Sequence, residues 1–416
     1  MQSIGGYGAT LTDAEIQGFI TASLADADVD GKSVCVVVPD ATRTCPLPLL
    51  LGAVHDAIAH RVSRLTVLVA LGTHQPLREE ALAAHVGPLP GATVVNHEWW
   101  LPDMLVDIGE LSADQVREAS GGRLAESVHI TVNRHIVEHD VALVVGPVFP
   151  HEVVGFSGGN KYFFPGVAGS DIIDLTHWLG ALITSSAIIG TPGVTPVRKL
   201  INEAAARLPC ARHCIALVVP SGMRLPIYAA YGSTEEAWAG AAEVSARVHV
   251  RYLDAPVRRV LSLVSPRYDD LWTAAKGMYK VDPVVADGGE VVIYQPSIDQ
   301  ISVSHGEEIA KIGYHCRDYF LAEPARMAGV HRSVVAHSTH VRGDGSYDDD
   351  HGERCRIAVI LATGISEAET RSVALDYRDP ASIDIEEWTR DPDTLVVPDA
   401  GEVLFRLRKD GRTALG

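Results

Sequence analysis

The chain has 416 residues, of which 47% are hydrophobic and 21% charged, as expected for a globular protein of about two domains. Its formal net charge of -18 argues against nucleic acid or an anionic membrane as a partner. No run is apolar enough to span a membrane, and the first residues lack the features of a signal peptide. Six cysteines without a C-x-x-C pair suit a reducing cytoplasm, and Cys210–Cys214 is not expected to bind zinc.

Strand-like apolar runs alternate with helical segments along the chain. In the first part we predict strands at 34–38, 65–71, 94–95, 130–132, 141–148 and 215–219, and helices at 48–59, 77–85, 172–182 and 196–208. After Ala255-Pro256 the pattern restarts, with strands at 260–264, 291–294 and 357–361 and helices at 269–280 and 307–321. This order of strand and helix is typical of parallel βαβ units.

The pattern predicts an α/β protein: two α/β domains with largely parallel sheets and an active-site cleft between them. Residues 1–256 would form an N-terminal domain and residues 257–390 a smaller C-terminal domain. The tail, 391–416, has short strands at 394–397 and 403–407, and its return to the first domain is left open.

Three strand ends in the first domain carry reactive side chains. Asp40 and Arg43 follow the first strand, either as a simple ion pair or with Arg43 as a fork for a carboxylate or phosphate. His74 follows the second strand, held between a turn glycine and Pro76. The third is the segment from His151 to His177. Because parallel strands end at the same edge of a sheet, we expect all these groups in one crevice.

The third strand end carries the run His-Glu-Val-Val-Gly-Phe-Ser-Gly-Gly-Asn-Lys, residues 151–161. Its lysine can be a nucleophile or a phosphate clamp, and its histidine a base or a metal ligand. The glycines allow the backbone to approach a bulky group closely. A helix-entry loop with a solvated lysine is the simpler alternative.

Several familiar motifs are absent. Gly155–Lys161 is not a phosphate-binding Walker loop, because Asn160 and Tyr162 replace its Gly and its Ser or Thr. No G-x-G-x-x-G follows the first strand, and no H-E-x-x-H occurs. The acidic run Gly343–Asp350 lacks the final Glu of a calcium loop and is predicted to be a solvated loop.

The chain resembles the nickel-pincer lactate racemases and their 2-hydroxyacid racemase and epimerase relatives. The likeness covers the whole chain, and His177 follows Lys161 by sixteen residues, the spacing of that family. The matching pieces are Asp40-x-Thr42-Arg43, Gly72-Thr73-His74-x-Pro76, Asn96-His97-Glu98, His151-x3-Gly155-x-Ser157-Gly158-Gly159-x-Lys161, Pro165-Gly166-x-Ala168-Gly169 and, in the second domain, Ala275-Lys276-Gly277.

The resemblance implies a nickel pincer nucleotide, pyridinium-3-thioamide-5-thiocarboxylic acid mononucleotide, in the first domain. Lys161 would join it through a thioamide link, with Ser157, Gly158 and Gly159 in the same cofactor-binding loop. His177 would be the nickel ligand that completes a planar set of sulfur, carbon and nitrogen donors, which suits Ni(II).

The resemblance also implies a small-molecule 2-hydroxy acid as substrate. His74 and His151 would be the acid/base pair on its two faces, Arg43 and Lys276 would hold its carboxylate, and Asp40 would orient one of these groups. C2 would be inverted by proton-coupled hydride transfer to the cofactor, through a planar 2-keto intermediate. Such chemistry requires a hydride acceptor that no side chain provides, and one base per enantiomer, a role that suits histidine.

The second domain departs from the lactate enzymes near Lys276. Trp272 and Thr273 stand where those enzymes carry Tyr and Gln, and 294–297 and His305 also differ. These residues would line the side-chain end of the pocket, which predicts a 2-hydroxy acid larger than lactate, with an aliphatic, aromatic or polyhydroxy side chain. The alternative is that Trp272 packs a domain interface and lactate is preferred.

Two other functions stay open. One is a 2-hydroxyacid dehydrogenase-like enzyme that passes its electrons to an external acceptor, and the other is a non-catalytic carrier of the nucleotide. The sequence also leaves open whether the chain forms a homo-oligomer.

Overall fold

The computed structural model describes residues 1–72 and 74–408, and backbone contacts divide the chain into two compact units. Both units are discontinuous, which differs from the predicted continuous domains 1–256 and 257–390. Unit 1 comprises residues 1–149, 156–173 and 192–248, and unit 2 comprises residues 150–155, 174–191 and 249–408.

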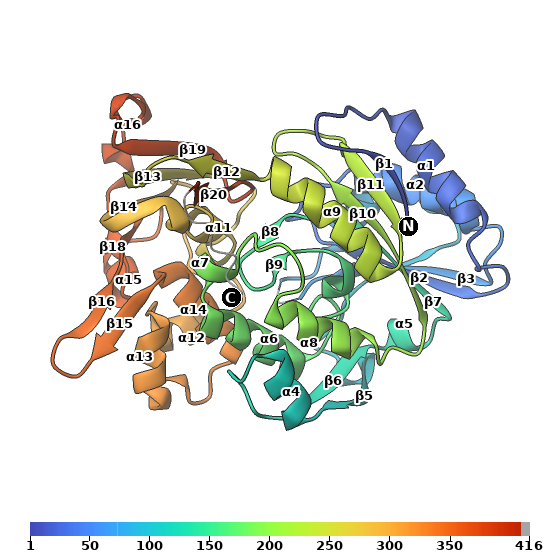
Figure 1. The fold of residues 1–416 in the computed structure, drawn as a ribbon, viewed down its shortest axis with the longest axis horizontal. Coiled ribbons are helices and arrows are strands. Elements are labelled where there is room, and N and C mark those ends of the chain that lie inside the picture. Colours follow the sequence, from blue (N-terminus) through green and yellow to red (C-terminus); the bar gives the residue numbers. More distant parts are fainter. Residues whose placement is uncertain (73, 409–416) are drawn as a thin grey trace. The chain divides into compact units, whose positions relative to one another are not determined.

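Unit 1 is built on a seven-stranded sheet in the order β1-β11-β10-β7-β2-β3-β4 (Figure 1). The strands from β10 to β4 are parallel, and β11 and β1 are antiparallel at one edge. The strands are β1 (Gln2–Gly5), β2 (Ser33–Pro39), β3 (Arg64–Ala70), β4 (Thr93–Asn96), β7 (Val141–Pro147), β10 (Ala211–Val218) and β11 (Tyr228–Gly232).

Helices cover this sheet, so β2 and β7 are buried along their whole length. Helices α1 and α2 share a core cluster with residues on one face of β2, including Val36 and Val38. Helix α9 packs against β10 and β11. The main helices of unit 1 are α1 (Asp13–Ala25), α2 (Leu47–Ile58), α3 (Glu79–Val86), α4 (Ala113–Ala119), α5 (Arg134–Val137), α8 (Pro196–Ala205) and α9 (Thr234–Val248).

The strand order of unit 1 creates a topological switch point. From β2 the chain proceeds to β3 and β4 on one side, and it later enters β7 and β10 on the other side. The carboxyl ends of β2 and β7 therefore flank the place where open α/β sheets bind their ligands.

One predicted strand lies outside this sheet. Residues 130–132 belong to β6 (Val128–Asn133), which pairs antiparallel with β5 (Leu105–Leu111) in a separate two-stranded sheet. The other predicted strands and helices of the first part correspond to elements of the structure within a few residues.

Unit 2 contains a parallel five-stranded sheet in the order β18-β17-β14-β13-β19. The described part of the chain tail contributes strands to this unit, because β19 completes the edge of β13 and β20 (Leu404–Leu407) pairs with β12 (Val250–Leu253). The sheet strands are β13 (Val257–Val264), β14 (Val285–Gln295), β17 (Ala358–Thr363), β18 (Asp376–Tyr377) and β19 (Thr394–Ala400). The two mostly parallel sheets confirm the predicted fold class.

The helices of unit 2 are shorter than predicted. The segment 269–280 forms two short helices, and the segment 307–321 is interrupted at Gly313, whose φ of +70° ends a helix. The acidic run 343–350 enters a hairpin of β15 (Gly345–Asp348) and β16 (Gly352–Cys355). The helices are α6 (Ser170–Ile183, shared with unit 1), α7 (Ser185–Ile188), α10 (Leu271–Ala274), α11 (Lys276–Tyr279), α12 (Gly306–Ile312), α13 (Arg317–Ala322), α14 (Arg332–Arg342), α15 (Glu367–Ser372) and α16 (Ile385–Arg390).

Among the described residues, no helix combines the length and the apolar character that a membrane crossing requires.

The close packing at the end of β7 can be tested at a single glycine. A Cβ atom on Gly146 would overlap the hydroxyl of Tyr162 and lie 2.5 Å from its Cζ atom. We expect Gly146→Ala to lower the free energy of unfolding by about 1–3 kcal/mol through overpacking. The control is Gly52→Ala, which meets no atom within 4 Å on helix α2 and should raise stability by about 0.5–1 kcal/mol. Urea unfolding measures both, and equal effects of the two substitutions would contradict this packing.

Candidate active site

Three neighbouring strands of unit 1 end in the predicted reactive residues. Asp40 and Arg43 follow β2, His74 follows β3, and Lys161 lies in the segment after β7. Because β7, β2 and β3 are adjacent and parallel, their carboxyl ends lie along one edge of the sheet. Thr73 of the Gly72-Thr73-His74 motif lies outside the described residues.

Asp40 and His74 form a buried acid–imidazole pair. Asp40 is 6% exposed, and its Oδ2 contacts Nδ1 of His74 while Oδ1 accepts the N–H of Thr42 at 3.1 Å and its hydroxyl at 2.7 Å. Burial by itself would raise the pKa of Asp40, but His74, Arg43 and Thr42 outweigh it and hold this pKa well below its usual range. The carboxylate therefore stays charged, and Nδ1 of His74 must carry the hydrogen because a carboxylate only accepts.

Arg43 stacks on an aromatic ring of the same unit. The guanidinium carbon lies 4.8 Å above the centre of the Phe149 ring, and the side chain is half-buried. A guanidinium stacked on an aromatic ring keeps its N–H edge available for a planar anion.

The loop between β7 and Lys161 is held by a buried arginine. Arg198 of α8 is 1% exposed, donates to the carbonyl of Gly158 at 2.9 Å and also to that of Phe156. Its guanidinium lies 4.3 Å from the ring centre of Trp238, whose indole N–H donates to the carbonyl of Ser157 at 2.9 Å. Three successive carbonyl groups, those of residues 156–158, are thus fixed by side chains from α8 and α9.

The glycines of this loop have a structural role. Gly158 and Gly159 have φ values of +85° and +57°, and a Cβ on Gly159 would lie 2.8 Å from Trp238 Cβ. The hydroxyl of Ser157 accepts the N–H of Phe149 at 3.1 Å. These contacts explain the Ser-Gly-Gly motif through the shape of the loop, and the predicted cofactor contacts of these three residues stay a prediction. Lys161 follows, half-buried, on a 3₁₀ turn at Gly159–Tyr162.

His97, another residue of the matching motifs, is a core histidine. It is fully buried, its Nε2 lies 3.0 Å from the carbonyl of Ala168, and its Nδ1 lies 3.0 Å from the amide nitrogen of Asn133. Burial lowers the pKa of His97 to about 4. The ring is therefore neutral and structural at physiological pH.

The two remaining predicted histidines belong to unit 2. His151 is 5% exposed, and its Nδ1 accepts the N–H of Val153 at 3.2 Å and lies 3.3 Å from Oε2 of Glu152. His177 is half-buried on α6. The structure thus divides the predicted residues between the units. Asp40, Arg43, His74 and Lys161 belong to unit 1, and His151 and His177 belong to unit 2.

Lys276 begins α11, near the carboxyl end of β13. It is 6% exposed, and its Nζ lies 4.9 Å from the ring centre of Tyr268. Trp272 stacks on His337, with ring centres 3.8 Å apart. The hydroxyl of Thr273 instead donates to Oδ1 of Asp270 at 2.8 Å, as part of the cap of α10. Thr273 therefore has a structural task beyond its predicted substrate contact.

Sequence reasoning missed the histidines of α14. His337 and His340 lie one helical turn apart on this unpredicted helix, 9% and 3% exposed. Burial lowers the pKa of His340 to about 4. Burial also lowers the pKa of His337 well below its usual value, and the charges of His340, His305, His177 and Lys276 lower it further. The signal was the i, i+3 spacing of two histidines, which is informative only once a helix is expected there.

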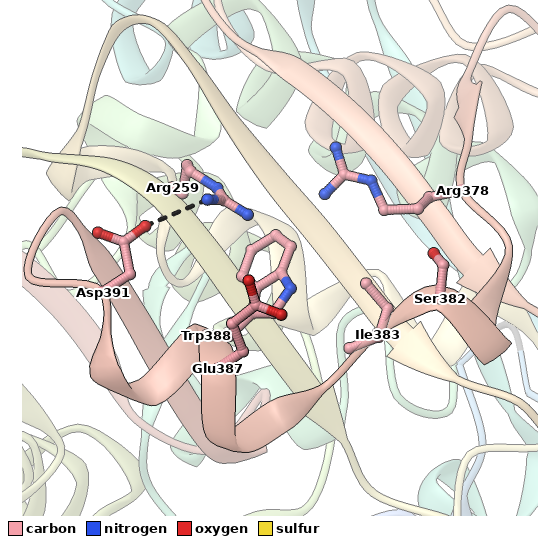
Figure 2. Close-up of a pocket in the computed structure, with 7 residues that line it drawn as sticks. All are labelled: Arg259, Arg378, Ser382, Ile383, Glu387, Trp388 and Asp391. Carbon is pink, nitrogen blue, oxygen red and sulfur yellow. Dashed lines mark hydrogen bonds and ion pairs between the residues drawn. The ribbon is translucent and has the colours of Figure 1, made fainter.

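Figure 2 shows a pocket of about 320 Å³ in unit 2, lined by Arg259, Arg378, Ser382, Ile383, Glu387, Trp388 and Asp391. Both arginines stack on Trp388, with guanidinium carbons 3.9 Å and 5.4 Å from its ring centre. Arg259 pairs with Asp391 at 3.1 Å, and Arg378 makes a bidentate pair with Glu290 at 3.1 and 3.2 Å. Since its cations are neutralised by carboxylates, this pocket does not form an anion site.

The pocket also lies on the opposite face of the unit 2 sheet from Lys276. Arg259 shares the face of Leu261, which belongs to the core cluster around Trp388. Ser262, on the other face, donates to the carbonyl of Gly277 in α11. The candidate site residues of unit 2 are therefore those near α11 and α14.

No group of three or more His, Cys, Asp and Glu side chains in the described part of the chain could hold a metal ion by itself. A metal held in part by a cofactor needs fewer protein ligands, and the half-buried His177 could supply one nitrogen donor.

Known proteins resemble this chain in sequence and in fold. A family profile described as "Lactate racemase N-terminal domain" matches residues 14–190. Two curated lactate racemases are similar: that of Thermoanaerobacterium thermosaccharolyticum is 25% identical over 69% of this chain, and that of Lactiplantibacillus plantarum is 24% identical over 66%. The matched regions cover 64% and 62% of these relatives, so the chain spans less than two thirds of their length.

Solved structures share the fold over nearly the whole chain. A crystal structure of a protein from Thermotoga maritima is 32% identical, with a TM-score of 0.89 over 96% of this chain and 99% of that chain. The lactate racemase apoprotein from T. thermosaccharolyticum is 18% identical, with a TM-score of 0.69 over 96% and 94% of the two chains, and this likeness shows the fold alone. Residues 14–190 therefore belong to the lactate racemase N-terminal domain family, and these matches confirm the resemblance found in the sequence.

The neutral state of His97 predicts a pH dependence of stability. Its pKa is about 4 in the folded protein against 6.5 for an unperturbed histidine, so the unfolded chain binds more protons between these values. The stabilisation is complete above pH 6.5 and is lost as the pH falls toward 4, by up to about 1.4 kcal/mol per pH unit. In urea titrations from pH 7.5 to 4.5, His97→Gln should show a shallower pH slope than the wild type.

The control is His129→Gln, whose side chain is 63% exposed and whose loss should leave the slope unchanged. An identical slope in wild type and His97→Gln would show that His97 is not held neutral.

Proposed function

We propose that the chain is a 2-hydroxyacid racemase or epimerase that inverts C2 through a 2-keto intermediate. The observation that carries the proposal is that both predicted acid/base histidines have a carboxylate beside Nδ1, His74 with Asp40 and His151 with Glu152. Inversion of a 2-hydroxy acid in both directions requires one proton acceptor for each enantiomer. A carboxylate at Nδ1 supports an imidazole that gains and loses a proton at Nε2.

The two pairs differ in protonation in a way that suits one direction of the reaction. Asp40 accepts a hydrogen bond from Nδ1–H of His74. In the neutral ring, Nε2 is therefore free of hydrogen and can accept a proton. Nδ1 of His151 accepts from Val153 in the neutral ring, so His151 can return a proton from Nε2 only when it is protonated on both nitrogens. A neutral His74 can therefore take a hydroxyl proton and a protonated His151 return one, and the reverse direction requires the exchanged protonation states. Glu152 can accept from Nδ1 of His151 when that ring is protonated.

The residues present fit the nickel pincer nucleotide that the family implies. The half-buried Lys161 offers a primary amine for attachment at the end of a rigid loop, and the half-buried imidazole of His177 is a nitrogen donor suited to Ni(II). When bound, this group supplies the hydride acceptor that protein side chains lack. Arg43 and Lys276 would bind the substrate carboxylate, Arg43 as a planar fork and Lys276 as a point charge.

A 2-hydroxyacid dehydrogenase is the second candidate, because it would use the same hydride chemistry. It needs only one acid/base residue, and two histidine–carboxylate pairs favour the racemase. A non-catalytic nucleotide carrier needs neither pair.

The attachment of the cofactor can be tested by intact-protein mass. Protein purified from a host that makes the nucleotide should carry an adduct, and Lys161→Ala should lose it because no amine remains at that position. His177→Ala should keep the adduct but lose nickel, since the nitrogen donor is gone. Lys199→Ala, a surface lysine paired with Glu118, is the control and should retain both. An adduct that persists in Lys161→Ala would refute the attachment site.

The acid/base assignment can be tested by chiral chromatography of 2-hydroxy acids. We expect His74→Ala and His151→Ala each to slow inversion in both directions by about 10²–10⁴-fold, because every cycle uses both histidines. His129→Ala removes an exposed histidine and should leave the rate unchanged. Near wild-type turnover in either active-site variant would rule out the two-base reaction.

A further inference from the structure

Unit 2 holds a cluster of buried polar atoms for which the described residues provide no hydrogen-bond partner. They are Nε2 of His305, His337 and His340 and the hydroxyl of Tyr314. Tyr314 is fully buried, and His337 and His340 are more than nine-tenths buried. Unpaired buried polar groups are rare and costly in native proteins, so a cluster of four indicates a ligand that completes them.

Aromatic contacts hold these groups together. Trp272 lies against both His305 and His337, with ring centres 4.5 Å and 3.8 Å away. Tyr314 meets His337 edge to face at 6.0 Å, and His340 lies one turn further along α14. Ring contacts thus link His305, Trp272, His337 and Tyr314, while Nε2 of the two imidazoles and the tyrosine hydroxyl have no partner among the described residues.

The cluster adjoins the proposed substrate site. His337 lies close enough to Lys276 and His177 for the charges of both to act on it. In the proposed function Lys276 holds the substrate carboxylate, so His337 lies in the same part of unit 2 as that carboxylate.

The donors and acceptors of the cluster determine which substrate side chains could pair with it. Nδ1 of His305 lies 3.3 Å from a carboxylate oxygen of Glu308, so in the neutral ring Nε2 is an acceptor that needs a donor. An alkyl or phenyl side chain would leave all four atoms unpaired. A second carboxylate only accepts, and it would leave Nε2 of His305 unpaired. A hydroxyl group both donates and accepts, so it can pair with every member of the cluster.

We propose that His305, His337, His340 and Tyr314 recognise the side chain of the 2-hydroxy acid, and that this side chain carries several hydroxyl groups. The proposal rests on the proposed function and names its substrate class, a polyhydroxy (sugar-derived) 2-hydroxy acid. Trp272 is a positioning residue that holds two of the imidazoles.

The test compares substrates and variants in one assay. For the loaded enzyme, kcat/KM for C2 inversion is measured with gluconate, 2-hydroxybutyrate, phenyllactate and malate. We expect gluconate to be the best of the four, and the ratio of gluconate to 2-hydroxybutyrate to fall about tenfold in Tyr314→Phe, which removes a single oxygen atom. His337→Phe should lower the ratio further, and His351→Phe, an exposed histidine of the β15–β16 hairpin, should leave it unchanged.

The outcomes separate this proposal from the proposed function. If the enzyme inverts 2-hydroxybutyrate, phenyllactate or malate best, or if Tyr314→Phe leaves the ratio unchanged, the polyhydroxy assignment is overturned while the racemase stands. If no 2-hydroxy acid is inverted, the proposed racemase activity is overturned. Calorimetric titration of the protein with gluconate then decides whether the cluster binds hydroxyl groups. Gluconate binding that Tyr314→Phe weakens would still support the cluster as a hydroxyl-binding site, and absent or unchanged binding would refute it.

Discussion

The buried guanidinium of Arg198 is the interaction on which the candidate site of unit 1 depends. Burial lowers the pKa of Arg198 to about 9, so the group still carries its charge at neutral pH. It donates to the carbonyls of Phe156 and Gly158 and stacks on Trp238, which fixes the loop after β7. Lys161 therefore starts from a backbone position set by two helices, and a covalent attachment there would have a defined origin.

Histidines of this chain show how partners decide the role of one residue type. His97 satisfies both ring nitrogens within the core and is structural. His74 has a charged carboxylate at Nδ1, and in the proposed function its other nitrogen transfers the proton. His337 and His340 have buried Nε2 atoms for which the described residues provide no partner, which points to recognition rather than proton transfer. Burial alone would not distinguish these cases, because His97, His337 and His340 are all buried.

The sequence predicted those features that depend on local pattern. Continuous apolar runs identified β2, β3 and β7, and residues directly after them identified Asp40, His74 and the loop to Lys161. The discontinuous units could not be predicted, because the assignment of 150–155 and 174–191 to unit 2 depends on contacts between distant segments. The α14 histidines were missed because their role depends on Trp272 and Tyr314, which are remote in sequence. Asp270 could have been recognised as the N-cap residue that binds Thr273, three positions later.

The central claim is that the hydrogen on C2 leaves and returns as hydride while the histidines move only the hydroxyl proton. Inversion of a 2-hydroxy acid in D₂O tests it most directly, with the C2 position of the product examined by proton NMR and mass spectrometry. A hydride does not exchange with water, so the inverted product should keep protium at C2 through many turnovers. Deuterium at C2 in proportion to the inverted product would contradict the claim and show that a base removes this hydrogen as a proton.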